Sequence, residues 1–130
     1  MKDLFGPVIS SYSRKQAIDD GVLVAFPEMQ EMAKEAGIVY PVALSETVWN
    51  MVEPTGKAKE HGECWKGRLW DVYTMLLHAI RGSKPGESLI EFQVIFTNHA
   101  GVKETKTLWT QVGPGDNREP VLTIMLPEDY

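Results

Sequence analysis

The segment from about Arg68 to Arg81 constrains the fold more than any other part of the chain. Projected at about 100° per residue, its apolar side chains cover well over half of the helix circumference. They are Leu69, Trp70, Val72, Tyr73, Met75, Leu76, Leu77, Ala79 and Ile80. A helix this apolar is usually buried on several sides. We therefore expect a central packing helix that lies against a sheet and is covered elsewhere by other helices or by a second subunit.

The remaining polar positions of this segment form one stripe. Asp71, Thr74, His78 and Arg81 are spaced i, i+3, i+7 and i+10, so they share a helix face. Such a stripe is usually a solvated face. The alternative is a cleft in which Asp71 and His78 form a general acid–base pair and Arg81 clamps an anion. Two helical turns separate Asp71 from His78, so they would share a substrate rather than bond to each other.

Local signals predict three shorter helices upstream. Ser13 and Gln16 have the spacing of a capping box, in which each side chain bonds to the other residue's backbone. Glycine or proline marks the end of each predicted helix. The helices are expected from Ser13 to Gly21, from Pro27 to Gly37 and from Ser45 to Pro54.

Apolar runs between these helices predict short strands. Val22–Phe26 is a continuous apolar run, typical of a buried strand. Ile38–Leu44 is interrupted by Pro41, which predicts an edge strand or an extended connection. The segment Glu53–Gly67 is rich in glycine and charge and is expected to be the longest loop.

The last third of the chain changes character. Three runs that alternate apolar and polar residues predict an antiparallel meander, with strands at Leu89–Phe96, Thr105–Val112 and Val121–Leu126. Gly113–Asn117 is predicted to be a hairpin connection in which glycine supplies positive φ. Helices first and hairpins last predict an α+β class, and 130 residues with no repeat predict a single domain over 1–130.

Composition limits the functional classes. The net charge of −5 does not favour nucleic-acid binding, because a phosphate backbone would repel the chain. No apolar stretch approaches the roughly 18 residues of a membrane span, and the N-terminus lacks the apolar core of a secretory signal. We therefore expect a cytoplasmic protein without a membrane anchor.

The chain's cysteine and histidines do not indicate a metal site. His61 and Cys64 have the spacing of half a zinc site, but no second Cys/His pair completes it, since His78 and His99 lie far away in the sequence. An inert thiol is the expectation for Cys64, with a nucleophilic role as the weaker alternative. We expect no metal and no cofactor.

Three segments of the chain resemble a family of short uncharacterised bacterial, plasmid and phage proteins. They are Tyr12–Val24, Gly67–Val72 and Gly113–Pro127. The resemblance covers nearly the whole chain, implies a bacterial or mobile-element origin, and brings no activity, because the family is a domain of unknown function. Chemistry and resemblance together mark the residues to test first for ligand binding as Arg14, Asp19, Asp20 and Asp116, with Trp70 and Asp71 on the central helix.

Three functional hypotheses follow. The first is a non-enzymatic accessory protein that acts by protein–protein contact with a partner or a homo-oligomer, because tryptophan and methionine are enriched at interfaces. The second is a small hydrolase or nucleic-acid-processing enzyme that uses Asp71, His78 and Arg81. The third is ligand or nucleic-acid binding through the arginines Arg14, Arg68 and Arg81.

Overall fold

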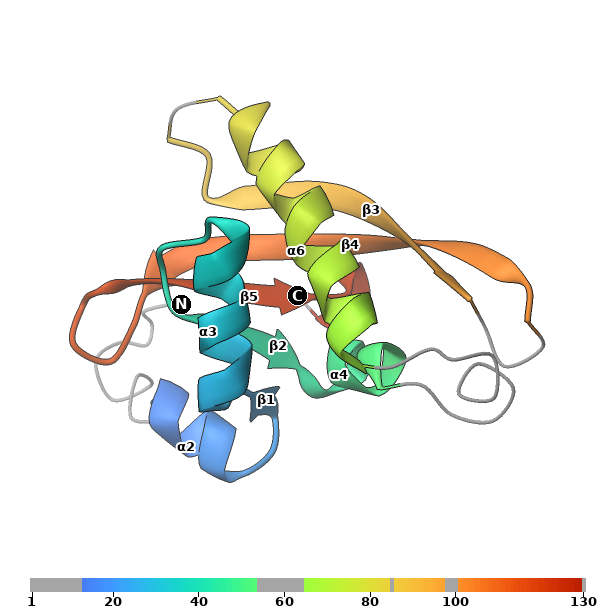
Figure 1. The fold of residues 1–130 in the computed structure, drawn as a ribbon. Coiled ribbons are helices and arrows are strands. Elements are labelled where there is room, and N and C mark those ends of the chain that lie inside the picture. The colour runs from blue at the N-terminus through green and yellow to red at the C-terminus, as the bar shows by residue number, and fades with distance from the viewer. Residues whose placement is uncertain (1–12, 54–64, 85, 98–100, 130) are drawn as a thin grey trace.

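The computed structural model describes residues 13–53, 65–84, 86–97 and 101–129. These residues form four α-helices, a five-stranded sheet and one short 3-10 helix, so the predicted α+β class is confirmed (Figure 1). The helices are α2 (Arg14–Asp19), α3 (Pro27–Ala36), α4 (Glu46–Val52), α6 (Trp65–Arg81) and the 3-10 helix η1 (Pro127–Asp129). The strands are β1 (Leu23–Val24), β2 (Val42–Ser45), β3 (Leu89–Thr97), β4 (Lys103–Pro114) and β5 (Pro120–Met125).

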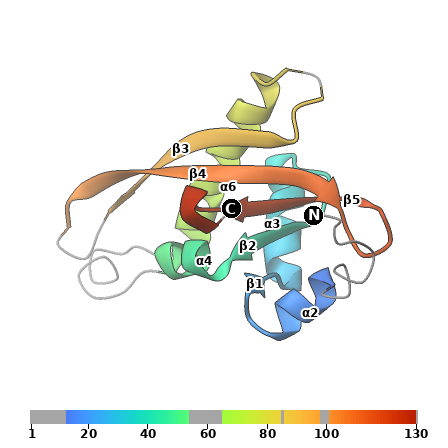
Figure 2. The same cartoon turned by 180° about the vertical axis from the view of Figure 1, so that it is seen from behind.

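The sheet is mixed and has the order β1-β2-β5-β4-β3. Strands β3, β4 and β5 form the predicted antiparallel meander. Strand β2 joins β5 in parallel, and β1 pairs antiparallel with β2. Helices α3 and α6 cover one face of this sheet, as the two opposite views show (Figures 1 and 2). Within the described residues, β1 and β3 are therefore the two edges.

One hydrophobic core lies between the sheet and these two helices. Alternate residues of each strand face the helices, as strand geometry requires. The core residues from the meander are Phe92, Val94, Phe96, Leu108, Leu122 and Ile124, and those from α6 are Leu69, Val72, Tyr73 and Leu76. The hydroxyl of Tyr73 donates a 3.0 Å hydrogen bond to the carbonyl of Met29 on α3, and burial raises the pKa of this phenol.

The predicted helix boundaries rest on local signals, and the structure confirms them for the first three helices where it describes them. The Ser13 hydroxyl accepts a 3.0 Å hydrogen bond from the Gln16 N–H, and the Gln16 side chain accepts one of 2.8 Å from the Ser13 N–H. Pro27 begins α3, and Gly37 ends it with a φ of 104°. Ser45 caps α4. Pro54 lies outside the described residues.

Of the two alternatives for Ile38–Leu44, an edge strand or an extended connection, the edge strand was wrong, whereas residues 38–41 do form a connection. The strand begins only at Val42, after Pro41, and lies inside the sheet between β1 and β5 with all four residues buried. Because Pro41 precedes the strand, its missing N–H costs no bond between strands. Its carbonyl accepts a 2.9 Å hydrogen bond from the N–H of Leu122.

Two other boundaries also differ from prediction. The strand expected over Val22–Phe26 is reduced to Leu23–Val24, which is half-buried at the sheet edge. Helix α6 begins at Trp65, three residues before the predicted start, so Trp65–Gly67 is helical rather than part of the loop. The rest of that predicted loop, at 54–64, lies outside the described residues.

The connection between β4 and β5 is the predicted hairpin, but glycine does not supply its positive φ. Gly113 and Pro114 belong to β4, and the left-handed residue is Arg118, with a φ of 64°. Gly115 serves a different purpose, because a Cβ atom there would lie 2.5 Å from the side-chain Cδ of Glu119. The glycine lets the Glu119 carboxylate fold over the turn, where it accepts a 2.9 Å hydrogen bond from the N–H of Asn117.

Candidate functional site

Helix α6 is open to solvent along one side rather than covered all round. Its core-facing residues are buried, but the side chains of Trp70 and Met75 are 42% and 40% exposed. The polar stripe of Asp71, Thr74, His78 and Arg81 lies on the same outer side and is exposed at every position. The sequence pattern overestimated burial because several large apolar residues of α6 flank the stripe instead of facing the core.

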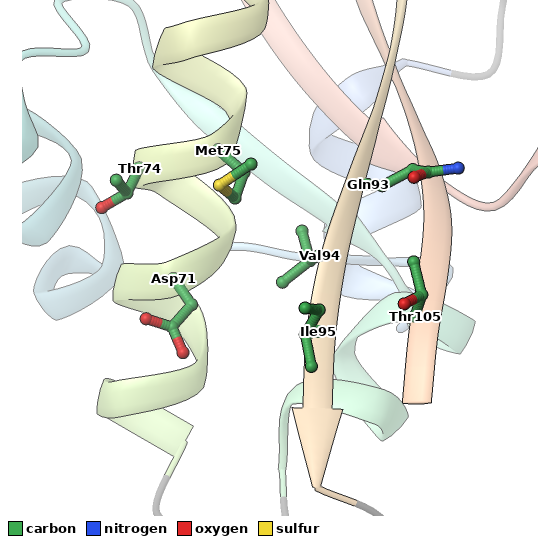
Figure 3. A pocket seen from close by; sticks show the side chains of 7 residues that line it. All are labelled: Asp71, Thr74, Met75, Gln93, Val94, Ile95 and Thr105. Carbon is green, nitrogen blue, oxygen red and sulfur yellow. The ribbon is translucent and has the colours of Figure 1, made fainter. Parts of the chain in front are cut away.

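A groove runs between this outer side of α6 and strand β3. Its volume is about 400 Å³, and its lining residues are Asp71, Thr74, Met75, Gln93, Val94, Ile95 and Thr105. In Figure 3, Met75 lies level with Gln93 along the strand, and Asp71 lies level with Ile95. The groove thus receives two members of the predicted stripe, Asp71 and Thr74. His78 and Arg81 are not among its lining residues.

The floor of this groove is an edge strand whose outward backbone groups can be identified. The N–H of Val112 donates a 2.8 Å hydrogen bond to the carbonyl of Ser88, which faces it directly in the β3–β4 register. In an antiparallel pair the bonding direction alternates along the strand. Even-numbered residues of β3 therefore bond to β4, and the backbone groups of Leu89, Glu91, Gln93 and Ile95 point away from it. In the described part of the chain, no strand pairs with them.

This edge lacks the features by which proteins usually block unwanted strand pairing. Natural edge strands are short or carry lysine, proline or a bulge. Strand β3 is nine residues long, contains neither lysine nor arginine nor proline, and has one charged residue, Glu91. Its register with β4 is continuous from Leu89 to Thr97, without a bulge. The side chain of Ile95 is 57% exposed.

The charge of Glu91 is directed toward the neighbouring strand. Its carboxylate accepts a 3.1 Å hydrogen bond from the indole N–H of Trp109 on β4, the residue directly opposite it. This bond lies on the sheet face away from α6. Glu91 therefore leaves the backbone edge accessible.

The structure brings Arg14 and Asp116 together and gives both a structural role. The two carboxylate oxygens of Asp116 accept hydrogen bonds of 2.8 and 3.0 Å from the N–H groups of Arg14 and Lys15, so Asp116 caps α2 from the distant β4–β5 turn. The Arg14 guanidinium donates to the Thr123 hydroxyl at 2.8 Å and to the Leu122 carbonyl at 3.0 Å. Desolvation lowers the pKa of Arg14, against the opposing effects of Asp116 and Glu119.

The other two candidates on α2 lie at the surface. Asp19 forms an exposed 3.0 Å ion pair with Lys15, a kind of contact that adds little stability. Asp20 is the exposed C-cap of the helix. Neither residue lines one of the described hollows, so their ligand-binding role stays a prediction.

Arg68, named in the third hypothesis, lies inside the protein. Its guanidinium donates a 2.6 Å hydrogen bond to the carbonyl of Met51 and lies 5.4 Å from the ring centre of Phe96. These contacts tie α6 to α4 and to the end of β3. Arg68 is thus a packing residue with a satisfied charge, and it is not displayed to an anionic ligand.

A polar cluster that sequence analysis missed joins the C-terminal turn to β2. The Asp129 carboxylate accepts hydrogen bonds from the hydroxyls of Ser45 and Thr47 and from the Leu126 N–H. Desolvation raises the pKa of Asp129, but these three bonds together outweigh it and lower the pKa overall. The cluster borders a second hollow of about 280 Å³. Its only local signal was Ser45 as a helix cap, because Asp129 is 84 residues away.

The described residues contain neither a cluster of metal-binding side chains nor a membrane-spanning helix. The described residues contain no group of three His, Cys, Asp or Glu side chains that could hold a metal ion. His61, Cys64 and His99 lie outside those residues, so the interpretations placed on them stay predictions. Among the described helices, none is both long and apolar enough to cross a bilayer.

Comparison with known proteins identifies a family and no activity. No curated protein and no solved structure matches the chain. One family model matches, over residues 1–130, and its description is a family of unknown function. The chain belongs to this family, DUF6573.

Proposed function

We propose that this protein acts by protein–protein contact through the outer backbone of β3 and the adjoining side of α6. We call this area the edge surface and define it by Asp71, Met75, Gln93 and Ile95, which line the groove between α6 and β3. The observation that carries the proposal is the nine-residue edge strand without lysine, arginine or proline. A long, apolar and unguarded edge is a template for pairing with another chain.

The side chains of the edge surface support the same function. Met75 and Ile95 are two of the large apolar residues with substantial exposure in the described chain. Methionine is enriched where proteins bind each other, because its flexible side chain adapts to a partner and buries apolar area on contact. A partner strand on β3 would contact Ile95 on the sheet face away from α6 and approach Met75 on the helix-covered face.

The sequence resemblance extends this proposal to the protein's setting. It supports an accessory protein of a bacterial genome or mobile element that acts in the cytoplasm. The net charge of −5 favours a protein partner over nucleic acid.

The enzymatic alternative has weaker geometric support. It needs Asp71, His78 and Arg81 around one substrate, yet only Asp71 lines the groove. All three side chains are exposed, and a general acid–base pair gains from a partly dry cleft that tunes its proton affinities. Binding through Arg14 and Asp116 has weaker support as well, because their polar groups already bond to α2 and β5.

Photo-crosslinking in cells tests the proposed contact. The full chain carries a photo-crosslinking amino acid at Ile95, on the edge surface, or at Val39, which is 77% exposed in the α3–β2 connection and serves as the matched control. We expect discrete adducts from position 95 and background labelling from position 39. An absence of discrete adducts from position 95, with the protein expressed and folded, would contradict the proposal.

A further inference from the structure

We infer that the partner of the edge surface is a second copy of this chain, paired β3 to β3 in antiparallel orientation about Gln93. This inference rests on the proposed function and names its partner. A two-fold axis through the edge would make one continuous sheet from both copies and place α6 of each copy on the same face. Each copy would bury the edge surface of the other.

The backbone of β3 is self-complementary in this register. The outward groups belong to odd-numbered residues, so antiparallel pairing centred on Gln93 sets Gln93 against its own copy and Glu91 against Ile95 of the second copy. Every such pair consists of two residues whose N–H and C=O groups both point across the new interface. A register shifted by one residue would set outward groups against inward ones and lose this match.

The side chains of β3 match in the same register. On the helix-covered face, Phe92 lies opposite Val94 of the second copy, so the apolar layer continues across the axis. On the other face, the acid Glu91 lies opposite Ile95. Like charges are therefore not placed directly across from each other, which would destabilise the pair.

Helix α6 supplies charge complementarity. Along its exposed stripe the acid, Asp71, lies toward the N-terminal end, whereas His78 and Arg81 lie toward the C-terminal end. Met75 lies between them and level with Gln93 along the strand (Figure 3). A two-fold axis at this level reverses the second helix, so Asp71 of one copy faces the basic end of the other. Complementary charges of this kind set orientation and exclude wrong partners.

The shape of the edge fits this arrangement. In Figures 1 and 2 the last turns of α6 extend past β3 on the side away from β4. The two-fold axis carries these turns of the second copy over the groove of about 400 Å³ beside Asp71 and Ile95. The whole polar stripe then contacts the second copy. His78 and Arg81 do so although they do not line the groove of their own copy.

The other edge of the sheet explains why the assembly closes. A head-to-tail contact between β3 and β1 of the next copy would build an open fibre. Strand β1 has only two residues, so it offers little backbone to a nine-residue strand. A two-fold contact between two β3 strands pairs the long edge of each copy and leaves only the short β1 edges unpaired.

Light scattering coupled to size-exclusion chromatography tests the inference on the full chain. We expect the mass of two chains for the unaltered protein and of one chain for Gln93→Pro, because proline removes an outward N–H at the centre of the new pairing and leaves the β3–β4 bonds intact. Val39→Lys, exposed but remote, should stay dimeric. An unaltered protein that is a monomer at all accessible concentrations, or a Gln93→Pro variant that is folded and dimeric, would overturn the inference.

Charge exchange on α6 keeps the test decisive if the proline variant does not fold. Asp71→Arg and Arg81→Asp should each weaken the dimer by roughly 10-fold or more in dissociation constant, and the double variant should recover most of that loss. Equal stability of the three monomers, checked by thermal melting, assigns the changes to the interface. Losses that simply add in the double variant would count against the two-fold arrangement.

The crosslinking experiment separates this inference from the proposed function. A monomer that forms adducts with a different protein at position 95 would overturn the second-copy assignment and leave the protein-contact proposal standing. A monomer without discrete adducts would overturn both.

Discussion

The two edges of the sheet end in different ways, and the proposed protein contact rests on this difference. At one edge β1 is two residues long, and the chain around it is already bonded: Val22 donates to the Ala17 carbonyl and accepts from the Glu46 N–H. At the other edge β3 runs for nine residues without a described partner strand. The same sheet is closed by local contacts on one side and left open on the other.

The supporting contacts of the two sides differ as well. Near β1, hydrogen bonds between distant parts of the chain stabilise the structure. Asp116 accepts from the backbone of α2, Arg14 donates to β5, and Asp129 accepts from Ser45. Near β3, the corresponding surface combines outward backbone groups with a mixture of apolar and polar side chains, and no described strand pairs with those backbone groups. A short edge with a bonded neighbouring backbone is a structural boundary. A long edge without lysine or proline is consistent with an interface.

The largest expected effect separates the inner and outer sides of β3. Val94→Pro should lower the free energy of unfolding by about 3 kcal/mol, because it removes an N–H that bonds to β4, leaves a carbonyl unsatisfied and disturbs a buried position. Gln93→Pro should cost less than about 1 kcal/mol, since proline is tolerated where the edge N–H faces solvent. Urea unfolding compares the two variants, at a protein concentration low enough to exclude self-association. Equal losses of stability would show that the assignment of even-numbered backbone groups to β4 and odd-numbered ones to the outer edge is wrong.

The next effect concerns the fastening near β1. Asp116→Ala should lower the free energy of unfolding by about 1 kcal/mol, the usual value of a helix cap, because two N–H groups of α2 lose their acceptor. Asp19→Ala is the control at the other end of the helix, where the exposed ion pair with Lys15 is worth less than about 0.5 kcal/mol. Chemical denaturation measures both. A control loss as large as that of Asp116→Ala would remove the distinction.

A smaller effect should depend on pH. The pKa of Asp129 is lowered in the folded protein from its ordinary 3.8, so its carboxylate stabilises the fold above about pH 4 and this contribution is lost as the pH falls through the folded-state pKa. Asp129→Asn should therefore melt at a lower temperature than the unaltered protein at pH 7, and the gap should narrow toward pH 3. A gap that is constant across this range would contradict the assignment.

The smallest effect on stability is expected from a lysine placed on each edge. Ile95→Lys and Val22→Lys both alter exposed apolar residues, so each should change the free energy of the monomer by less than about 0.5 kcal/mol. Only Ile95→Lys should abolish self-association, measured by sedimentation velocity. If both variants, or neither, changed the association, the contrast between the edges would fail.

Prediction from sequence succeeded where the determining contacts lie within a few residues. The capping box of Ser13 and Gln16, the proline at the start of α3 and the left-handed Gly37 at its end act through bonds inside one helical turn. The meander was predicted because its strands follow each other along the chain. Local chemistry specifies such elements regardless of what packs on them.

Prediction failed where the partner is distant in sequence. Pro41 indicated an edge strand or an extended connection, but the parallel pairing of β2 with β5 places Val42 and Leu44 inside the sheet, opposite residues 80 positions away. The cap from Asp116 crosses 102 positions. For the candidate site, the stripe on α6 was visible in the sequence, whereas the groove beside it depends on where β3 lies.

The sequence alone determined the helices, the meander, the α+β class and the amphipathic character of the segment from Arg68 to Arg81, because periodicity and caps act locally. Only the tertiary structure decided which strands are edges, which side of α6 stays exposed, and that Arg14 and Asp116 fasten the fold. These features depend on the order of strands in the sheet, which arises from contacts between distant segments. The interface proposed for β3 belongs to this second group, because an edge exists only once the rest of the sheet has formed.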